Sequence, residues 1–145
     1  MEKIAKELKS FSKFIGLIAL YKVYDLVAYF TTVSDLDIGS VDAVAQTMMP
    51  VVKALGAAPI VLSILVHLFL CIKGYKEAND PSPAKFHIIL GFLATIGYTL
   101  SVIGAISALF EGVTAMRIVN LLFAAASAVL MFFYSKYAKE IRTQE

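Results

Sequence analysis

The chain has 145 residues, of which 59% are hydrophobic and only 17% are charged. Soluble domains normally contain about 45–50% apolar and about 25% charged residues, so this composition predicts an integral membrane protein. The single cysteine, Cys71, excludes an intramolecular disulfide framework and a multi-cysteine metal cluster. Because the chain contains no tryptophan, tyrosines such as Tyr75, Tyr134 and Tyr137 are expected to anchor it at the membrane interface.

Residues 1–13 place lysines between apolar residues at helical spacing. The lysines are Lys3, Lys6, Lys9 and Lys13. Two structures fit this pattern. One is a basic amphipathic segment that lies on an anionic membrane surface, and the other is a solvated extension of the first spanning helix.

Residues 14–32 form the first predicted span. Lys22 and Asp25 stand near its middle, three residues apart, so their side chains share a helix face and can form an ion pair. A charge in hydrocarbon costs roughly 3 kcal/mol on insertion scales, so the pair should face other helices or a water-filled cavity. Tyr29 extends the same face by one turn.

Residues 33–49 follow, with three aspartates and no basic residue. The stretch 35–39 resembles part of a calcium loop, but position twelve is glutamine rather than glutamate, so no metal site is predicted. Ser40 is the expected N-cap of a short helix that runs along the membrane surface as far as Met49.

The second predicted span covers residues 50–72. Pro50 suits a first helical turn, whereas Pro59 lies inside the span and should kink it. Residues 73–85 are the most loop-like part of the chain. Within them, Ser82 is the expected N-cap of the next helix, with Pro83 at its first position.

The third and fourth spans are predicted at residues 86–109 and 113–134. A tight turn at Glu111 and Gly112 should make them antiparallel neighbours. Small residues form a stripe along each helix. They are Ala94, Gly97, Ser101, Gly104 and Ala108 on the third, and Ala124, Ser127 and Ala128 on the fourth. Such stripes let helices approach closely in lipid, which predicts intramolecular packing, with a homodimer contact as the alternative.

These patterns predict an all-α fold with a single transmembrane domain over residues 1–145. Its four helices should form a left-handed, antiparallel up-down bundle. The N-terminus, the loop at 73–85 and the C-terminal tail hold ten of the thirteen lysines and arginines. By the positive-inside rule both termini should be cytoplasmic, and we expect the membrane to be a prokaryotic plasma membrane.

A candidate binding site follows from the depth of the polar side chains. At a rise of about 1.5 Å per residue, Lys22, Asp25 and Tyr98 fall near the midplane, and Asn120 lies roughly 8 Å toward the outside. The full candidate set is Lys22, Asp25, Tyr29, Lys53, Tyr98, Arg117 and Asn120. In the alternative interpretation Tyr98 only hydrogen-bonds the ion pair, while Lys53 and Arg117 extend to the outer headgroups.

A metal or catalytic site is not predicted. His67 and Cys71 are four residues apart, but His87 should lie roughly 7 Å nearer the surface, which does not suit a metal or a haem. The chain has no G-x-S-x-G, no H-E-x-x-H and no phosphate-binding glycine loop, so we expect neither an enzyme nor a cofactor.

A carboxylate in the first of four spans invites comparison with the small multidrug transporters. Their acid has no lysine beside it, however, and this chain lacks their functional tryptophan, so no family is assigned. Two functions remain. One is transport or permeation of a small solute, ion or proton, and the other is an accessory role beside a membrane protein partner or a second copy. We expect the protein to be surrounded by the lipid bilayer and not to bind nucleic acid.

Overall fold

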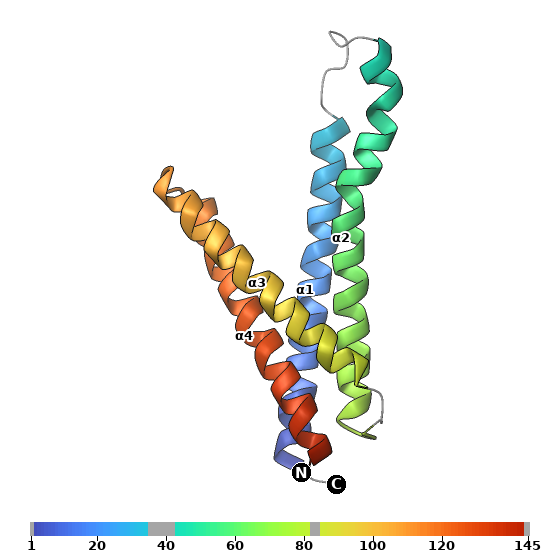
Figure 1. Cartoon of the computed structure of the whole chain (residues 1–145), viewed down its shortest axis with the longest axis vertical. Coiled ribbons are helices and arrows are strands. Elements are labelled where there is room, and N and C mark those ends of the chain that lie inside the picture. The colour runs from blue at the N-terminus through green and yellow to red at the C-terminus, as the bar shows by residue number, and fades with distance from the viewer. Residues whose placement is uncertain (1, 35–42, 82–84, 144–145) are drawn as a thin grey trace.

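The computed structural model contains four long α-helices and describes residues 2–34, 43–81 and 85–143 (Figure 1). The helices are α1 (Glu2–Ser34), α2 (Ala43–Glu77), α3 (Phe86–Phe110) and α4 (Ala115–Thr143). Each is long and apolar enough to cross a membrane. The predicted all-helical, four-helix fold is therefore confirmed.

Two segments that the sequence predicted to lie outside the long helices are instead part of α1 and α2. α1 begins at Glu2 without a break, so residues 2–13 are the first part of that helix and not a separate segment. Its inner side is packed rather than solvated, because Leu8 and Ser12 are fully buried. The predicted surface helix ending at Met49 is also wrong, since α2 begins at Ala43 and continues through Pro50 and Pro59. Ser40 and the stretch 35–39 lie outside the described residues.

α3 begins and ends close to the predicted bounds. Its N-cap is Lys85, which makes no side-chain capping bond, so the cap predicted three residues earlier is wrong; Ser82 and Pro83 themselves lie outside the described residues. The predicted tight turn follows α3. Gly112 has φ of +148°, which glycine adopts without the steric penalty of a side chain, and its amide donates to the Leu109 carbonyl at 3.2 Å.

The helices pack as two pairs that diverge (Figure 1). α1 lies along α2, α3 lies along α4, and the pairs meet mainly through α1 and α4. The two chain ends lie together where the pairs meet, which we call the closed end. The other end, where the α3–α4 turn stands apart from α1 and α2, is the open end.

The apolar core lies toward the closed end. Its buried residues come from all four helices and are Leu8, Ile15, Ile18, Leu70, Ala78, Ile88, Met131, Tyr134 and Ala138. Phe11 stacks on Phe133 and on Tyr137, with ring centroids 5.8 and 5.5 Å apart, and so joins α1 to α4. Tyr134 is fully buried in this core, so the prediction that it anchors the membrane interface is wrong.

Close helix approach depends on glycines other than those predicted. A Cβ at Gly74 would overlap the Tyr134 ring and the Ser12 hydroxyl, and a Cβ at Gly91 would overlap the Ser135 hydroxyl. At Gly97 and Gly104, by contrast, an added Cβ would meet no atom within 4 Å.

The predicted packing role of the α3 stripe is therefore wrong beyond Ala94. The reason is the divergence of the two helix pairs, which leaves the face of α3 that carries Gly97 and Gly104 without a neighbouring helix. The α4 stripe does pack inside the protein, since Ala124 and Ser127 are only 7% and 1% exposed.

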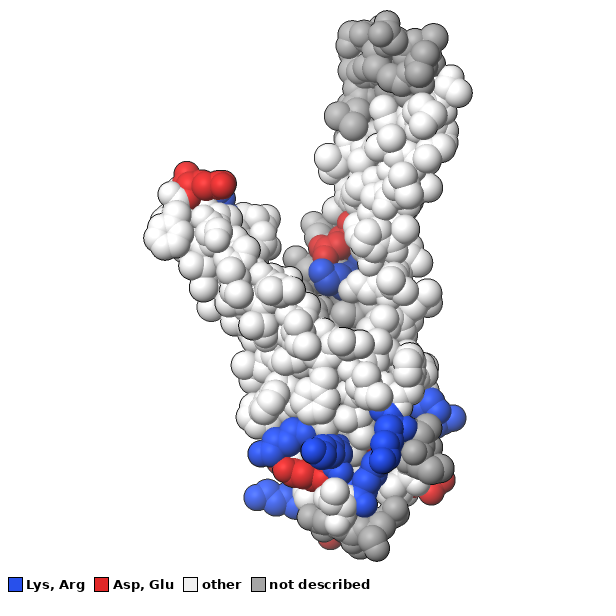
Figure 2. Space-filling view, viewed as in Figure 1, with Lys and Arg blue, Asp and Glu red and all other residues white. Residues whose placement is uncertain are grey.

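A buried charge cluster ties three helices together at the closed end. Arg142 of α4 donates from Nε to the Glu77 carboxylate of α2. His87 of α3 lies with Nε2 3.9 Å from the other Glu77 oxygen, and both side chains are only 2% exposed. Figure 2 shows lysines and arginines gathered around the same end.

Candidate functional site

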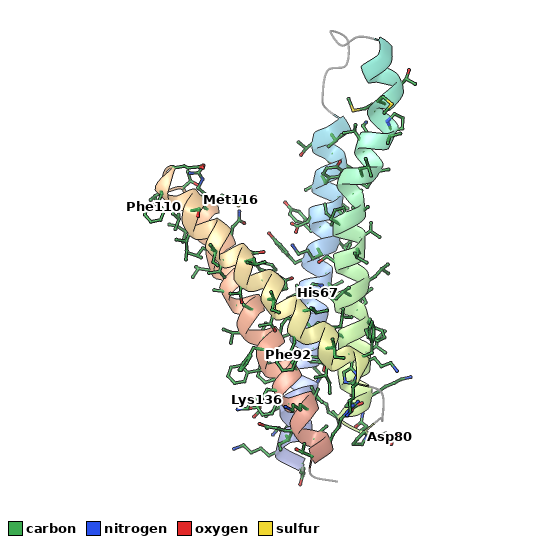
Figure 3. The ribbon with its side chains drawn as sticks, viewed as in Figure 1. His67, Asp80, Phe92, Phe110, Met116 and Lys136 are labelled. Carbon is green, nitrogen blue, oxygen red and sulfur yellow. The ribbon has the colours of Figure 1, made fainter. Side chains whose placement is uncertain are left out.

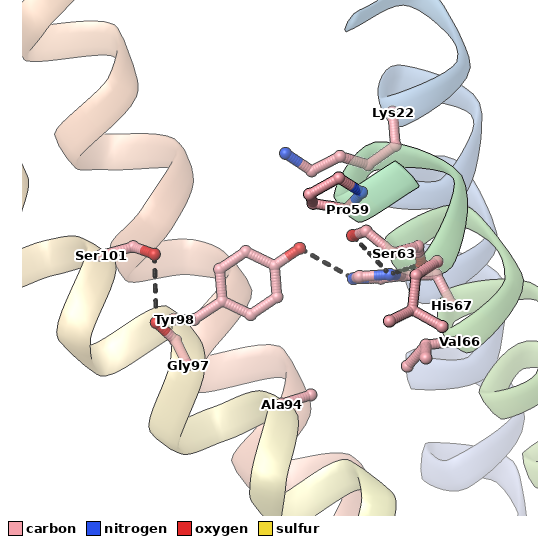
Figure 4. Close-up of a pocket in the computed structure, with 10 residues that line it drawn as sticks. Lys22, Pro59, Ser63, Val66, His67, Ala94, Gly97, Tyr98 and Ser101 are labelled. Atoms are coloured by element: carbon pink, nitrogen blue, oxygen red, sulfur yellow. Dashed lines mark hydrogen bonds between the residues drawn. The ribbon is translucent and has the colours of Figure 1, made fainter. Parts of the chain in front are cut away.

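Two cavities lie between the helix pairs, where they begin to diverge. The larger, of about 580 Å³, is lined by residues of α1, α2 and α3, among them Lys22, His67 and Tyr98 (Figure 4). The smaller, of about 250 Å³, is lined by α1, α3 and α4 and reaches Asp25 and Asn120. Lys22, Tyr98 and Ser101 line both, so the two cavities adjoin. Figure 2 shows opposite charges accessible in the space between the pairs.

The Lys22–Asp25 ion pair predicted from their spacing is formed. Lys22 Nζ donates to Asp25 Oδ2 at 3.1 Å, and the two side chains are 24% and 30% exposed. The ammonium also lies 5.9 Å from the centroid of the Tyr21 ring and 5.7 Å from that of Phe123. These two rings contact each other across α1 and α4, with centroids 4.4 Å apart. The ammonium is thus held by a carboxylate and two aromatic rings.

A second polar group links α2 to α3 on the wall of the larger cavity. His67 Nδ1 lies 2.5 Å from the Ser63 carbonyl, and His67 Nε2 lies 2.7 Å from the Tyr98 hydroxyl (Figure 4). Because a carbonyl only accepts, Nδ1 carries the proton in the neutral imidazole. Nε2 then accepts from Tyr98, whose oxygen also forms a side-chain hydrogen bond with Ser127 of α4. Figure 3 places His67 where α2 approaches α3.

Four of the seven candidate residues come together around the smaller cavity. They are Lys22 and Asp25 of α1, Tyr98 of α3 and Asn120 of α4. The other three line neither cavity. The Tyr29 hydroxyl donates instead to the Lys53 carbonyl at 3.2 Å, which fastens α1 to α2 nearer the open end.

Arg117 lies at the α3–α4 turn rather than at the cavity. Its Nη1 donates to the carbonyls of Ala108 and Gly112, at 2.6 and 2.8 Å, and its Nη2 lies 3.4 Å from Glu111 Oε2. A cation there satisfies carbonyls that the end of a helix leaves without partners. Its observed contacts are those of a helix cap.

Sequence reasoning missed three residues of the site. Phe123 follows Asn120 by three residues on α4, so helical spacing could have placed both on one face. Ser63 precedes His67 by four residues in the same way. The place of Tyr21 could not be predicted, because its approach to Phe123 depends on how α1 crosses α4.

No known family, characterised protein or solved structure matches this chain. The function must therefore be argued from the residues themselves. Within the described ranges, no three histidine, cysteine or acidic side chains are grouped closely enough to hold a metal ion. What the site offers is an ammonium, a carboxylate, aromatic faces and the hydroxyl of Tyr98. These groups can bind a charged or polar solute.

Proposed function

We propose that this protein is a membrane transporter that binds a small solute, ion or proton between its two helix pairs, at Lys22 and Asp25. The observation that carries the proposal is the cavity that reaches Asp25. An ion pair inside a membrane is expensive, and intramembrane charges are commonly found on solute or proton pathways. An ion pair that only stabilised the fold would be sealed between helices, whereas this one is partly accessible from the cavity.

In the proposed arrangement, neighbouring helices cross the membrane in opposite directions and both termini are cytoplasmic. The clustering of basic side chains at the closed end supports this orientation. The cavities would then open toward the outside. The charge cluster of Glu77, His87 and Arg142 would seal the cytoplasmic side, as alternating access requires of an outward-open state.

An accessory role is the second candidate, and one observation favours it. Gly97 and Gly104 of α3 have open space beside them, and a helix of another membrane protein or of a second copy could pack there. Copurification in a mild detergent would reveal such a partner.

The topology can be tested with single cysteines in a Cys71→Ser background. Val113→Cys stands at the α3–α4 turn and is exposed, and Asn79→Cys lies beyond the end of α2 and is also exposed. We expect a membrane-impermeant thiol reagent to label Val113→Cys in intact cells and Asn79→Cys only after the cells are opened. Labelling of both positions in intact cells would contradict the proposed topology.

Transport can be tested with the purified protein in liposomes. We expect the parent to carry protons or a solute above the level of empty liposomes, and Asp25→Asn to fall to that level because the carboxylate is lost. The Lys22→Met/Asp25→Leu double variant should be folded and equally inactive. Flux should be measured between about pH 5.5 and 8.5, a range that brackets neutral titration.

Lys13→Met is the matched control for these variants. Lys13 lies on the same helix and is exposed, and the substitution is the one made at Lys22. Its flux should equal that of the parent. If the parent and the folded double variant both carry nothing above empty liposomes, the transport proposal is wrong and the accessory role is the better one.

A further inference from the structure

We propose that the solute bound between the helix pairs is an organic cation, an amine or quaternary ammonium with apolar substituents. In this structure the ammonium of Lys22 occupies the place of the solute cation. The inference rests on the proposed transport function and names the class of its substrate.

The groups around Lys22 Nζ are those that recognise ammonium ions. The Asp25 carboxylate lies 3.1 Å away, and the rings of Tyr21 and Phe123 both have their centroids within 6 Å. Cations within about 6 Å of an aromatic centroid are attracted by the negative ring face, and aromatic sites of this kind bind quaternary ammonium ligands. The surroundings that hold this lysine would hold a solute ammonium equally well.

Lys22 also has a second position available. Its side chain lines both cavities, so rotation of its flexible four-carbon stem can carry the ammonium from the smaller cavity toward the larger. The Tyr98 oxygen on the larger cavity donates its own proton to His67, and its hydrogen bond with Ser127 uses one of its two lone pairs. The second lone pair can accept a hydrogen bond from the ammonium of Lys22. A solute cation and Lys22 would therefore compete for a single carboxylate.

The larger cavity suits the apolar part of such a solute. Its lining includes Pro59, Leu62, Val66 and Ala94, and its volume of about 580 Å³ lies within the usual range of ligand pockets, roughly 300–1,000 Å³. An anion is disfavoured at the ammonium itself. It would approach the Asp25 carboxylate and the faces of two aromatic rings, which carry negative potential.

The test measures binding of tetrapropylammonium to the full-length protein in detergent by calorimetry. We expect the parent to bind, and Lys22→Met to bind about tenfold more tightly because the competing ammonium is gone. Lys22→Arg keeps a competing cation and should bind like the parent. Asp25→Asn should bind at least about tenfold more weakly, since a charged partner is lost. Lys13→Met is the control for the loss of one positive charge on α1.

Several outcomes would overturn the inference. Binding that is unchanged or lost in Lys22→Met would show that Lys22 does not compete with the cation. Lys22→Gln gives the same information if Lys22→Met does not fold, as judged by its helical circular dichroism and melting curve. Binding of benzoate that disappears in Lys22→Met would assign the site to an anion instead.

The failure of this inference differs from the failure of the proposed function. If the parent carries protons in liposomes but no variant binds tetrapropylammonium, the substrate class is wrong and transport stands. If the parent shows neither flux nor binding, the proposed function itself is wrong.

Discussion

Replacing Gly74 with alanine should lower the melting temperature of the detergent-solubilised protein, although alanine is the better helix former. The new Cβ would overlap the ring of Tyr134, which is fully buried in the core, and the hydroxyl of Ser12, which is bonded to the Leu8 carbonyl. The Ser12 hydroxyl can rotate, but the Tyr134 ring is enclosed by the core on all sides. Overpacking of this kind typically costs about 1–3 kcal/mol of the free energy of unfolding.

Gly91→Ala should be destabilising to a smaller extent. Its Cβ would overlap the Ser135 hydroxyl, which can rotate away at the loss of its 2.9 Å bond to the Met131 carbonyl, and it would come within 3.1 Å of the Tyr134 ring, a tight contact but not the overlap that arises at Gly74. The same substitution at Gly97 and Gly104 provides the matched control. Alanine meets no atom within 4 Å at either position, and should raise stability by about 0.5–1 kcal/mol through its helix propensity.

Thermal unfolding, monitored by circular dichroism, ranks the four variants by melting temperature. A Gly74→Ala protein that melts at or above the parent would show that α2 does not approach α4 as closely as described. A large loss in Gly97→Ala or Gly104→Ala would show that another helix covers that part of α3, as a second copy or a partner would.

The sequence predicts the helices well because each span is a long apolar segment. The bounds of α3 and the turn at Gly112 follow from local signals that need no knowledge of packing. The beginning of the first helix is harder to predict. A lysine-rich amphipathic segment has the same sequence pattern whether it forms a separate surface helix or continues into the next helix. The unbroken course of α1 and the burial of Leu8 and Ser12 distinguish the two.

The small-residue stripes show where sequence reasoning ends. Gly97 and Gly104 have the spacing of a packing face, but spacing does not say whether another helix is present there. That depends on the divergence of the two helix pairs, which results from contacts between segments far apart in the chain. Three glycines do permit close approach. Gly74 and Gly91 stand near helix ends and are opposed by Tyr134 and Ser135 of α4, and Gly56 lies within α2 and is opposed by Tyr29 of α1.

The candidate site was predicted in part for the same reason. Depth along a helix can be counted from the sequence, and it correctly grouped Lys22, Asp25, Tyr98 and Asn120. The neighbouring helix toward which a side chain points, and the hydrogen bonds that cap a helix end, cannot be counted from the sequence in this way. Tyr29 points toward α2, and Arg117 is held at the end of α3.

The Glu77–Arg142 and Lys22–Asp25 ion pairs should differ strongly in their coupling energies. Glu77 is 2% exposed and its partner Arg142 14%, whereas Lys22 and Asp25 are 24% and 30% exposed. Removing one member of a buried pair leaves the other charge uncompensated and costs about 3–5 kcal/mol. The sequence alone predicts that large value for Lys22 and Asp25. These two side chains are exposed to a cavity. If water fills that cavity, we expect a coupling energy of about 0.2–1 kcal/mol, as for solvent-exposed pairs.

Two double-mutant cycles measure this difference as free energies of unfolding in detergent. In the first, Arg142→Met and Glu77→Leu should each be strongly destabilising, and the double variant should recover most of the loss because no charge is left buried. In the second, Lys22→Met, Asp25→Leu and their double variant should be nearly additive. A coupling for Lys22 and Asp25 as large as that for Glu77 and Arg142 would mean that the space between the helix pairs is dry. A dry site would remove the water-accessible carboxylate on which proton or solute exchange depends, and would favour the accessory role.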